Sequence, residues 1–422
     1  MSIQHRLIGM NFLQFFVWGL WLISLGGYMF TLAGDMSVRG SLVGDTYGTM
    51  GWASLFMPAI MGILADKYLR AEIVLGLCHL LAGLCLYYAG TLTNANDLYY
   101  AIFFTSCFYM PTIALSNSVS YTLLSKNNFD VQKSFAPIRV WGTVGFIVAE
   151  WLIDGLDWEG SSRQFNLASV AEVATAAYCF SLPACQLVKN KSNSSFAKKL
   201  GLDAFVLFKD KKMAIFFLFA MLIGAALQIT NMFGSAFLQD FGTIDAYKNS
   251  FAVKHSIILI SLSQIAETLF ILAIPFVLNR YGIKKVMLIS LAAWVLRFAL
   301  FGIGNPGTGL VFLILSMIVY GMAFDFFNIS GSLYVDKQTD KSIRSSAQGL
   351  FMLMTNGLGA ILGGVFAGRV VDYFTTTVGN VSTKNWASIW FTFAGYAFVI
   401  LILFLLLFKH KHTKLEVEDL QH

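Results

Sequence analysis

Twelve apolar segments, each long enough to cross a lipid bilayer, dominate this sequence. A membrane-spanning helix needs about 20 mostly apolar residues. The segments cover residues 7–32, 44–65, 71–92, 98–124, 136–156, 166–187, 212–239, 251–279, 285–304, 309–335, 345–373 and 386–408. Because backbone N–H and C=O groups find no water in the bilayer core, isolated segments of this kind must be helical. The sequence therefore predicts an all-α membrane protein with twelve transmembrane helices.

The composition agrees with a surface that faces lipid. Only 12% of the 422 residues are charged and 57% are apolar, whereas about 25% of the residues of a soluble protein are charged. The net charge of +6 comes from basic residues in short loops, where it determines topology. We therefore expect membrane lipid around the chain, and we expect no nucleic-acid partner.

The distribution of basic residues predicts the orientation of the helices. If the N-terminus is cytoplasmic, 21 of the 29 Lys and Arg residues fall in cytoplasmic loops and ends, and six fall on the outer side. Cytoplasmic loops of membrane proteins carry such an excess of positive charge. Both termini are therefore expected in the cytoplasm.

A polar, basic stretch with the sequence KNKSNSSFAKKLGLDAFVLFKDKK divides the chain in the middle. We interpret it as a cytoplasmic linker that carries an amphipathic segment at the membrane surface. The predicted divisions are an N-terminal six-helix half (residues 1–188), the linker (189–211), a C-terminal six-helix half (212–409) and a cytoplasmic tail (410–422).

Tight basic turns follow the second and eighth predicted helices, GILADKYLR at 62–70 and NRYGIKK at 279–285. Parallel six-helix repeats of this kind describe the major facilitator architecture. The first turn resembles the loop motif of that superfamily, although Leu69 stands where the motif has Gly. Asp66 is expected to cap a neighbouring helix N-terminus and to pair with basic residues, and Arg70 is the last residue of the motif. The alternative is a plain positively charged turn.

One polar stripe is predicted on the helix at 136–156. Arg139, Thr143 and Phe146 are spaced i, i+4, i+7 and share a helix face. An Arg, a hydroxyl and an aromatic ring together suit a polar, planar ligand. In the alternative interpretation, Arg139 extends to the cytoplasmic surface.

Two pairs of polar residues lie in the helices at 212–239 and 251–279. Gln228 and Asn231 form one pair, Gln264 and Glu267 the other, and each is spaced i, i+3 on one face. Amides offer donors and acceptors together. The alternative is that they join helices by hydrogen bonds, although a carboxylate at this depth is costlier.

An acidic residue among aromatics marks the helix at 309–335. Tyr320, Phe324 and Asn328 are spaced i, i+4, i+8, with Asp325 beside them. Desolvation favours the neutral form of such a carboxyl group, so Asp325 is a candidate proton carrier. The alternative is a structural salt bridge with Arg297.

Other positions carry weaker signals. Trp18, Trp21 and Tyr28 can line a cavity or face lipid, and Gln14, Asn117 and Tyr121 are possible cavity residues. His79 and His255 are expected to be packed or interfacial.

Signatures of enzymes and ATP-driven pumps are absent from the sequence. It has no HExxH, nucleophile elbow or P-loop pattern, and its five cysteines lack metal-ligand spacing. We expect no catalytic residues, no metal site and no enzymatic activity.

Several long runs resemble the bacterial nucleoside permease family, the nucleoside:proton symporter branch of the major facilitator superfamily. They are FLQFFVWGLWLISLGGYMF, FAPIRVWGTVGF, LQITNMFG, SLSQIAETLFILAIPF, VYGMAFDFFNISGS and SAQGLFMLMTNGLG. The resemblance extends over all twelve predicted helices, is closest in the second half, and is poor at 154–165 and in the linker.

The resemblance implies a central nucleoside site and proton-driven uptake across the bacterial inner membrane, with uridine, adenosine or a similar substrate. The implied substrate-binding residues are Arg139, Thr143, Phe146, Gln228, Asn231, Gln264, Glu267, Tyr320 and Phe324. Asp325 or Glu267 would exchange the proton, which is the coupling ion; no other cofactor is expected, and the chain is expected to be a monomer.

Three functions stay open on sequence grounds. A proton-coupled sugar or xanthosine permease on the same fold is the nearest alternative to a general nucleoside permease, although the aromatic wall around Phe324 favours a flat base. A receptor that does not transport is the third. The sequence determines neither the preferred nucleoside nor the carboxylate that holds the proton.

Overall fold

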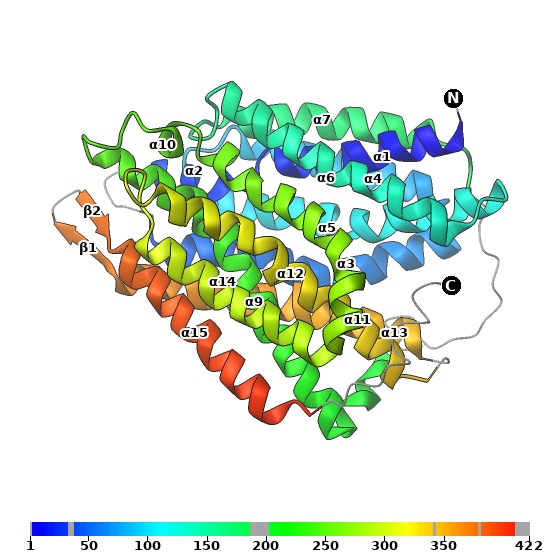
Figure 1. The fold of residues 1–422 in the computed structure, drawn as a ribbon. Helices are drawn as coiled ribbons and strands as arrows, with labels where there is room; N and C mark the ends of the chain where they lie inside the picture. Colours follow the sequence, from blue (N-terminus) through cyan, green and yellow to red (C-terminus); the bar gives the residue numbers. More distant parts are fainter. Residues whose placement is uncertain (1, 33–37, 186–201, 341–342, 379–380, 410–422) are drawn as a thin grey trace. The chain divides into compact units, whose positions relative to one another are not determined.

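The computed structural model describes residues 2–32, 38–185, 202–340, 343–378 and 381–409. Helices make up almost all of this part of the chain (Figure 1). Among the described residues, nine helical segments are long and apolar enough to cross a bilayer. The predicted class, an α-helical protein that crosses the membrane many times, is confirmed.

Contacts between residues divide the chain into two compact units, Met1–Ser195 and Phe196–His422. The division falls inside the predicted linker, of which residues 189–201 lie outside the described part. The finer boundaries of the predicted halves, and the tail at 410–422, stay predictions.

The described residues of the first unit form seven helices in chain order. They are α1 (Ile3–Gly19), α2 (Leu25–Thr31), α3 (Gly40–Lys67), α4 (Ala71–Ala89), α5 (Ala95–Lys126), α6 (Val131–Gly155) and α7 (Arg163–Phe180). The predicted helix at 7–32 is interrupted, since a turn separates α1 from α2.

The second unit contains longer helices and a small hairpin. Its elements are η1 (Leu202–Lys209), α9 (Lys211–Asp240), η2 (Phe241–Thr243), α10 (Phe251–Lys254), α11 (Ser256–Ile303), α12 (Leu310–Gln338), α13 (Arg344–Met352), the π-helical η3 (Leu353–Gly359), α14 (Ala360–Tyr373), β1 (Thr375–Val378), β2 (Val381–Lys384) and α15 (Trp386–Leu407). The helices predicted at 251–279 and 285–304 are joined in α11, which breaks at Gly282 (φ 75°, ψ 165°). A positive φ of this size favours glycine.

The hairpin β1–β2 lies where the sequence predicted only a loop. Its strands are antiparallel, with Thr375 opposite Lys384. Lys384 forms a 3.1 Å ion pair with Asp240 at the end of α9, and the Trp386 indole nitrogen donates to the same carboxylate at 2.7 Å. Local β-propensity of Thr and Val forms the strands, and these contacts fasten the hairpin to α9.

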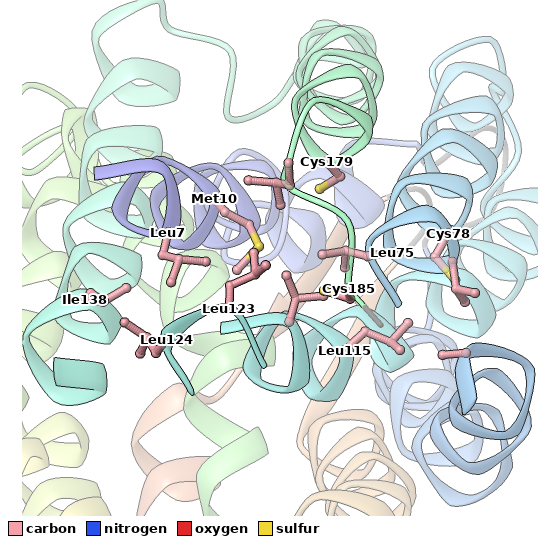
Figure 2. Close-up of a cluster of buried hydrophobic side chains, with 14 residues drawn as sticks. Leu7, Met10, Leu75, Cys78, Leu115, Leu123, Leu124, Ile138, Cys179 and Cys185 are labelled. Carbon is pink, nitrogen blue, oxygen red and sulfur yellow. The ribbon is translucent and has the colours of Figure 1, made fainter. Parts of the chain in front are cut away.

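Apolar side chains from six helices, including Ala65 of α3, form the core of the first unit (Figure 2). Leu7 comes from α1, Leu75 from α4, Leu123 from α5 and Ile138 from α6, and each is at most 2% exposed. Cys179 of α7 completes this group. Because all five cysteines are free thiols, those in the core act as small apolar side chains.

Glycines allow close contacts between helices in both units. A Cβ at Gly145 of α6 would lie 2.2 Å from the carbonyl oxygen of Phe12 in α1. A Cβ at Gly224 of α9 would lie 2.1 Å from the carbonyl oxygen of Thr355 in η3. Small residues let helix backbones approach closely where lipid provides no hydrophobic drive. The first and fifth predicted helices of each half therefore pack alike.

Candidate functional site

Arg139 and Phe146 of α6 both contact aromatic side chains of α1. The guanidinium carbon of Arg139 lies 3.9 Å from the centroid of the Phe15 ring. Phe146 and Trp18 meet edge to face with ring centroids 6.1 Å apart. Thr143, between them on the same stripe, is half-buried. The cation–π contact holds Arg139 against α1.

Gln228 and Asn231 of α9 are both half-buried. Neither side chain hydrogen-bonds to any residue in the part of the chain that the structure describes, whereas their neighbours Ile229 and Thr230 are almost fully buried. A polar group that joined helices would show an interhelical hydrogen bond. The two amides therefore have donors and acceptors available for a ligand.

Gln264 and Glu267 of α11 and Asp325 of α12 lie in the second unit, where α11 packs along α12. Asp325 is 4% exposed, and Glu267, which is half-buried, interacts with it electrostatically. The Gln264 amide nitrogen is best placed facing the Ile260 and Ser261 carbonyl oxygens, at 3.0 and 3.1 Å. Its amide oxygen is then directed away from those two carbonyls.

A stacked aromatic pair stands one turn from this acidic group. The rings of Tyr320 and Phe324 lie 6.3 Å apart between centroids with planes 13° from parallel. Tyr320 is 7% exposed and Phe324 is half-buried. The Oδ2 atom of Asp325 makes no hydrogen bond to the described residues. An aromatic face and a carboxyl group thus come together on one helix, as the spacing predicted.

Arg297 does not form the salt bridge with Asp325 that was the alternative interpretation. Its side chain is buried and donates to the Ser316 carbonyl oxygen at 2.9 Å and to Ser263 Oγ at 3.3 Å. The guanidinium also lies over the Tyr320 ring, 4.4 Å from its centroid. Arg297 therefore fixes Tyr320 and leaves the Asp325 carboxyl without a basic partner among the described residues.

Arg70 of the predicted loop motif has an acidic partner that the sequence did not predict. Arg70 forms an ion pair with Glu72, with Nε 3.0 Å from Oε1. The other oxygen of Glu72 accepts from the Cys185 backbone N–H at 3.1 Å. Asp66 is exposed and caps no helix within the described residues. Its role stays a prediction.

The first unit contains a buried polar cluster that was not predicted from the sequence. The His79 ring on α4 contacts the Glu172 carboxylate on α7 with Nδ1 and the Gln14 amide on α1 with Nε2. All three side chains have no exposed surface. Their only common signal in the sequence is that polar side chains lie inside apolar segments, since 93 residues separate His79 from Glu172.

Residues 1–413 match the family model described as nucleoside H+ symporter.

The chain belongs to this family.

The family match confirms the predicted resemblance and places the chain among permeases. Xanthosine permease of Escherichia coli (strain K12) is 50% identical over 419 residues, covering 99% of each chain. Nucleoside permease NupG of the same strain is 47% identical over 416 residues, covering 98% of each. A solved structure of a mutant of nucleoside transporter NupG has a TM-score of 0.92 at 46% identity, covering 97% of this chain and all of that one.

Proposed function

We propose that this symporter family member carries nucleosides together with protons across the bacterial cytoplasmic membrane. The observation that supports it best is the acidic group of the second unit. Asp325 is almost fully buried, Glu267 interacts with it electrostatically, and Arg297 is engaged elsewhere. A carboxylate at membrane depth without a basic partner is costly unless it takes up a proton. Proton binding at this group would couple transport to the proton gradient.

Nucleoside recognition is assigned to polar and aromatic side chains of both halves. Gln228 and Asn231 offer amide groups for base edges and ribose hydroxyls, and Arg139 and Thr143 add donors. Phe324, with Tyr320 stacked behind it, offers a face on which a base can lie. Phe146, Gln264 and Glu267 complete the proposed set.

The finer topology belongs to the same proposal. The chain would have twelve transmembrane helices, with α11 supplying two of them on either side of the break at Gly282. Both termini would be cytoplasmic, as the positive charge of the loops predicts. The transporter would work as a monomer by alternating access of its two halves around the bound nucleoside.

Xanthosine is a second candidate substrate. Xanthosine permease and nucleoside permease NupG of Escherichia coli are 50% and 47% identical to this chain, a difference too small to separate them. Purine and pyrimidine nucleosides share the ribose and a flat base, so one aromatic face accepts both. The preferred base has to be found by measurement.

The proton gradient provides enough free energy for accumulation. One proton entering down a potential of about 100 mV supplies roughly 2.3 kcal/mol. Each unit of pH gradient adds about 1.4 kcal/mol. At one proton per nucleoside, the two terms together allow accumulation of several hundredfold.

Counterflow in liposomes tests the proposed substrate. Purified protein is reconstituted with unlabelled uridine, adenosine, xanthosine or a hexose inside, and the same solute in labelled form is added outside. We expect transient accumulation of label with at least one nucleoside inside and none with the hexose. Counterflow of the hexose but of no nucleoside would identify a sugar permease. If none of the solutes shows counterflow, the proposed transport is contradicted.

A further inference from the structure

The cluster of His79, Glu172 and Gln14 belongs to the first unit, whereas the carboxyl groups to which the proposed function assigns the proton belong to the second. His79 Nδ1 is 2.5 Å from Glu172 Oε2, and His79 Nε2 is 2.9 Å from Gln14 Oε1. His79 and Glu172 are both 0% exposed. Buried ionisable groups at membrane depth mark functional sites more often than surface groups do.

Hydrogen bonds around Gln14 determine which nitrogen of His79 carries a proton. The Gln14 amide nitrogen donates to Thr112 Oγ1 at 2.6 Å. Thr112 itself donates its hydroxyl proton to the Tyr109 carbonyl oxygen at 2.6 Å, so its oxygen can only accept from Gln14. The oxygen of the Gln14 amide therefore faces His79 and accepts. It follows that His79 Nε2 carries a hydrogen.

The opposite side of the ring then needs a second proton. Nδ1 faces a carboxylate oxygen at 2.5 Å. If neither atom carried a hydrogen, two lone pairs would be directed at each other. A proton must lie between them, as an imidazolium beside a carboxylate or an imidazole beside a carboxylic acid. Both forms have no net charge, whereas loss of the proton would leave one unpaired negative charge in a fully buried site.

Contacts of α1 connect this pair with the proposed substrate residues of α6. The Tyr109 hydroxyl donates to the Gln14 backbone carbonyl at 2.5 Å. Trp18, one turn further along α1, packs against the Tyr109 ring with centroids 5.5 Å apart and against Phe146. Phe15, next to Gln14, lies under Arg139.

We propose that His79 and Glu172 form a second proton-binding site of this transporter, whose proton positions α1 and thereby Arg139 and Phe146. The inference rests on the proposed function for its consequence in transport. The site itself follows from the hydrogen bonds. When the pair is protonated, His79 holds Gln14 by a hydrogen bond, and the aromatic side chains of α1 support the substrate residues. When the proton leaves, His79 Nδ1 and the Glu172 carboxylate repel each other and this support is lost.

Few other ionisable groups act on the pair. Cys78 of α4, Cys179 of α7 and Tyr109 of α5 interact with Glu172, but thiols and phenols are ordinarily neutral at pH 7. Arg139 of α6 acts on Tyr109. Gln14 faces the pair from α1. Protonation of the His79–Glu172 pair therefore depends little on the charge of other groups.

The variant Glu172→Gln distinguishes the effect of the proton from the effect of the hydrogen-bond geometry of the site. A glutamine amide can donate to Nδ1 of a neutral His79, so both hydrogen bonds of the ring persist without an exchangeable proton. Glu172→Leu, the matched control, removes the hydrogen bond as well. Uridine affinity is measured for the three proteins by calorimetry between pH 6 and pH 9.

In the wild type, uridine affinity should fall on the alkaline side, approaching about tenfold per pH unit for one linked proton. We expect Glu172→Gln to bind uridine with a flatter alkaline limb, and Glu172→Leu to bind weakly at every pH. The same pH profile in the wild type and in Glu172→Gln would overturn the linkage to substrate binding.

The proton can also be observed without any substrate. A variant in which glutamine replaces the five other histidines leaves His79 as the single ¹⁵N-labelled imidazole. An imidazolium signal, or an infrared band of a protonated carboxyl group that disappears in Glu172→Gln, would locate the proton. A neutral ring together with an ionised carboxylate would overturn the site. This measurement stays decisive even if uridine proves to be the wrong substrate.

Discussion

Arg139 and Phe15 form a cation–π pair between α6 and α1, with 3.9 Å between the guanidinium carbon and the ring centroid. A Cβ at Gly142, one turn along α6, would lie 2.6 Å from the Phe15 ring and 2.8 Å from Arg139 Nη1. Glycine at this position thus leaves the space in which the pair forms.

Removing the guanidinium or the ring beneath it should weaken nucleoside binding to different extents. Arg139→Ala loses directional hydrogen bonds to the ligand and is expected to abolish detectable binding, since unpaired groups cost about 1–3 kcal/mol each. Phe15→Leu keeps the apolar volume but loses the π face, which costs about 0.5–2 kcal/mol. Isothermal calorimetry with uridine measures both, with Phe15→Tyr and the exposed Arg280→Ala as controls. Normal affinity in Arg139→Ala would remove it from the site.

Gln264→Ala should abolish binding in the same way while the protein still inserts and purifies. The side chain is half-buried in α11, so its loss leaves a ligand group without a partner at a cost of about 1–3 kcal/mol. The same calorimetric titration checks it, and thermal unfolding of the purified variant serves as the control for folding. Near-normal uridine affinity would show that Gln264 acts within α11 alone.

Phe324 should contribute to binding by stacking. Phe324→Ala is expected to weaken uridine binding by about 1–3 kcal/mol, because base–aromatic stacking has that magnitude, whereas Phe324→Tyr retains the π face and most of the affinity. Competition binding with a series of nucleosides gives the comparison. If both substitutions weaken binding equally, Phe324 packs the fold beside Tyr320 and does not touch the base.

Asp325 and Glu267 should differ in their effect on coupling. Asparagine at position 325 mimics the protonated carboxyl group and cannot release a proton. Asp325→Asn is therefore expected to exchange nucleoside for nucleoside, yet to lose accumulation driven by an imposed pH step, a factor of about ten per pH unit for one proton.

Paired assays on Asp325→Asn and Glu267→Gln separate the two roles. Counterflow reports exchange, and uptake after a pH step reports coupling. Loss of pH-driven uptake alone in Glu267→Gln, with Asp325→Asn unaffected, would reverse the assignment. Full coupling in both variants would show that the coupling proton binds at other residues, and the His79–Glu172 pair would be the next candidate.

Gly224 should be needed for the close contact between α9 and the π-helical η3. Its Cβ position lies 2.1 Å from the Thr355 carbonyl oxygen, so Gly224→Ala must push the two helices apart. Overpacking costs about 1–3 kcal/mol. Thermal unfolding in detergent measures this. The matched control is Gly395→Ala in α15, where a Cβ meets nothing within 4 Å and alanine should be neutral or stabilising by up to about 1 kcal/mol. Equal stability of the two variants would contradict the close contact.

Part of the candidate site could be predicted from local spacing. Residues such as Tyr320 and Phe324 are four apart, so helical geometry alone places them on one face, and the structure shows their rings stacked. The Arg297 side chain could not be assigned in this way. Its partners Ser263 and Ser316 come from other parts of the chain, and the choice between them and Asp325 depends on how α11 folds back and packs against α12.

The sequence by itself determined the class of protein, because a bilayer admits apolar segments of this length only as helices. Ionisable residues are costly inside such segments, so the few that occur there could be identified from the sequence. It also determined which residues share a helix face. Tertiary structure decided what those faces meet. The pairing of His79 with Glu172, 93 residues away, and the approach of Phe15 to Arg139 depend on helix packing. Many packings satisfy the same apolar pattern equally well, and only side-chain shape and hydrogen bonding between distant helices select one of them.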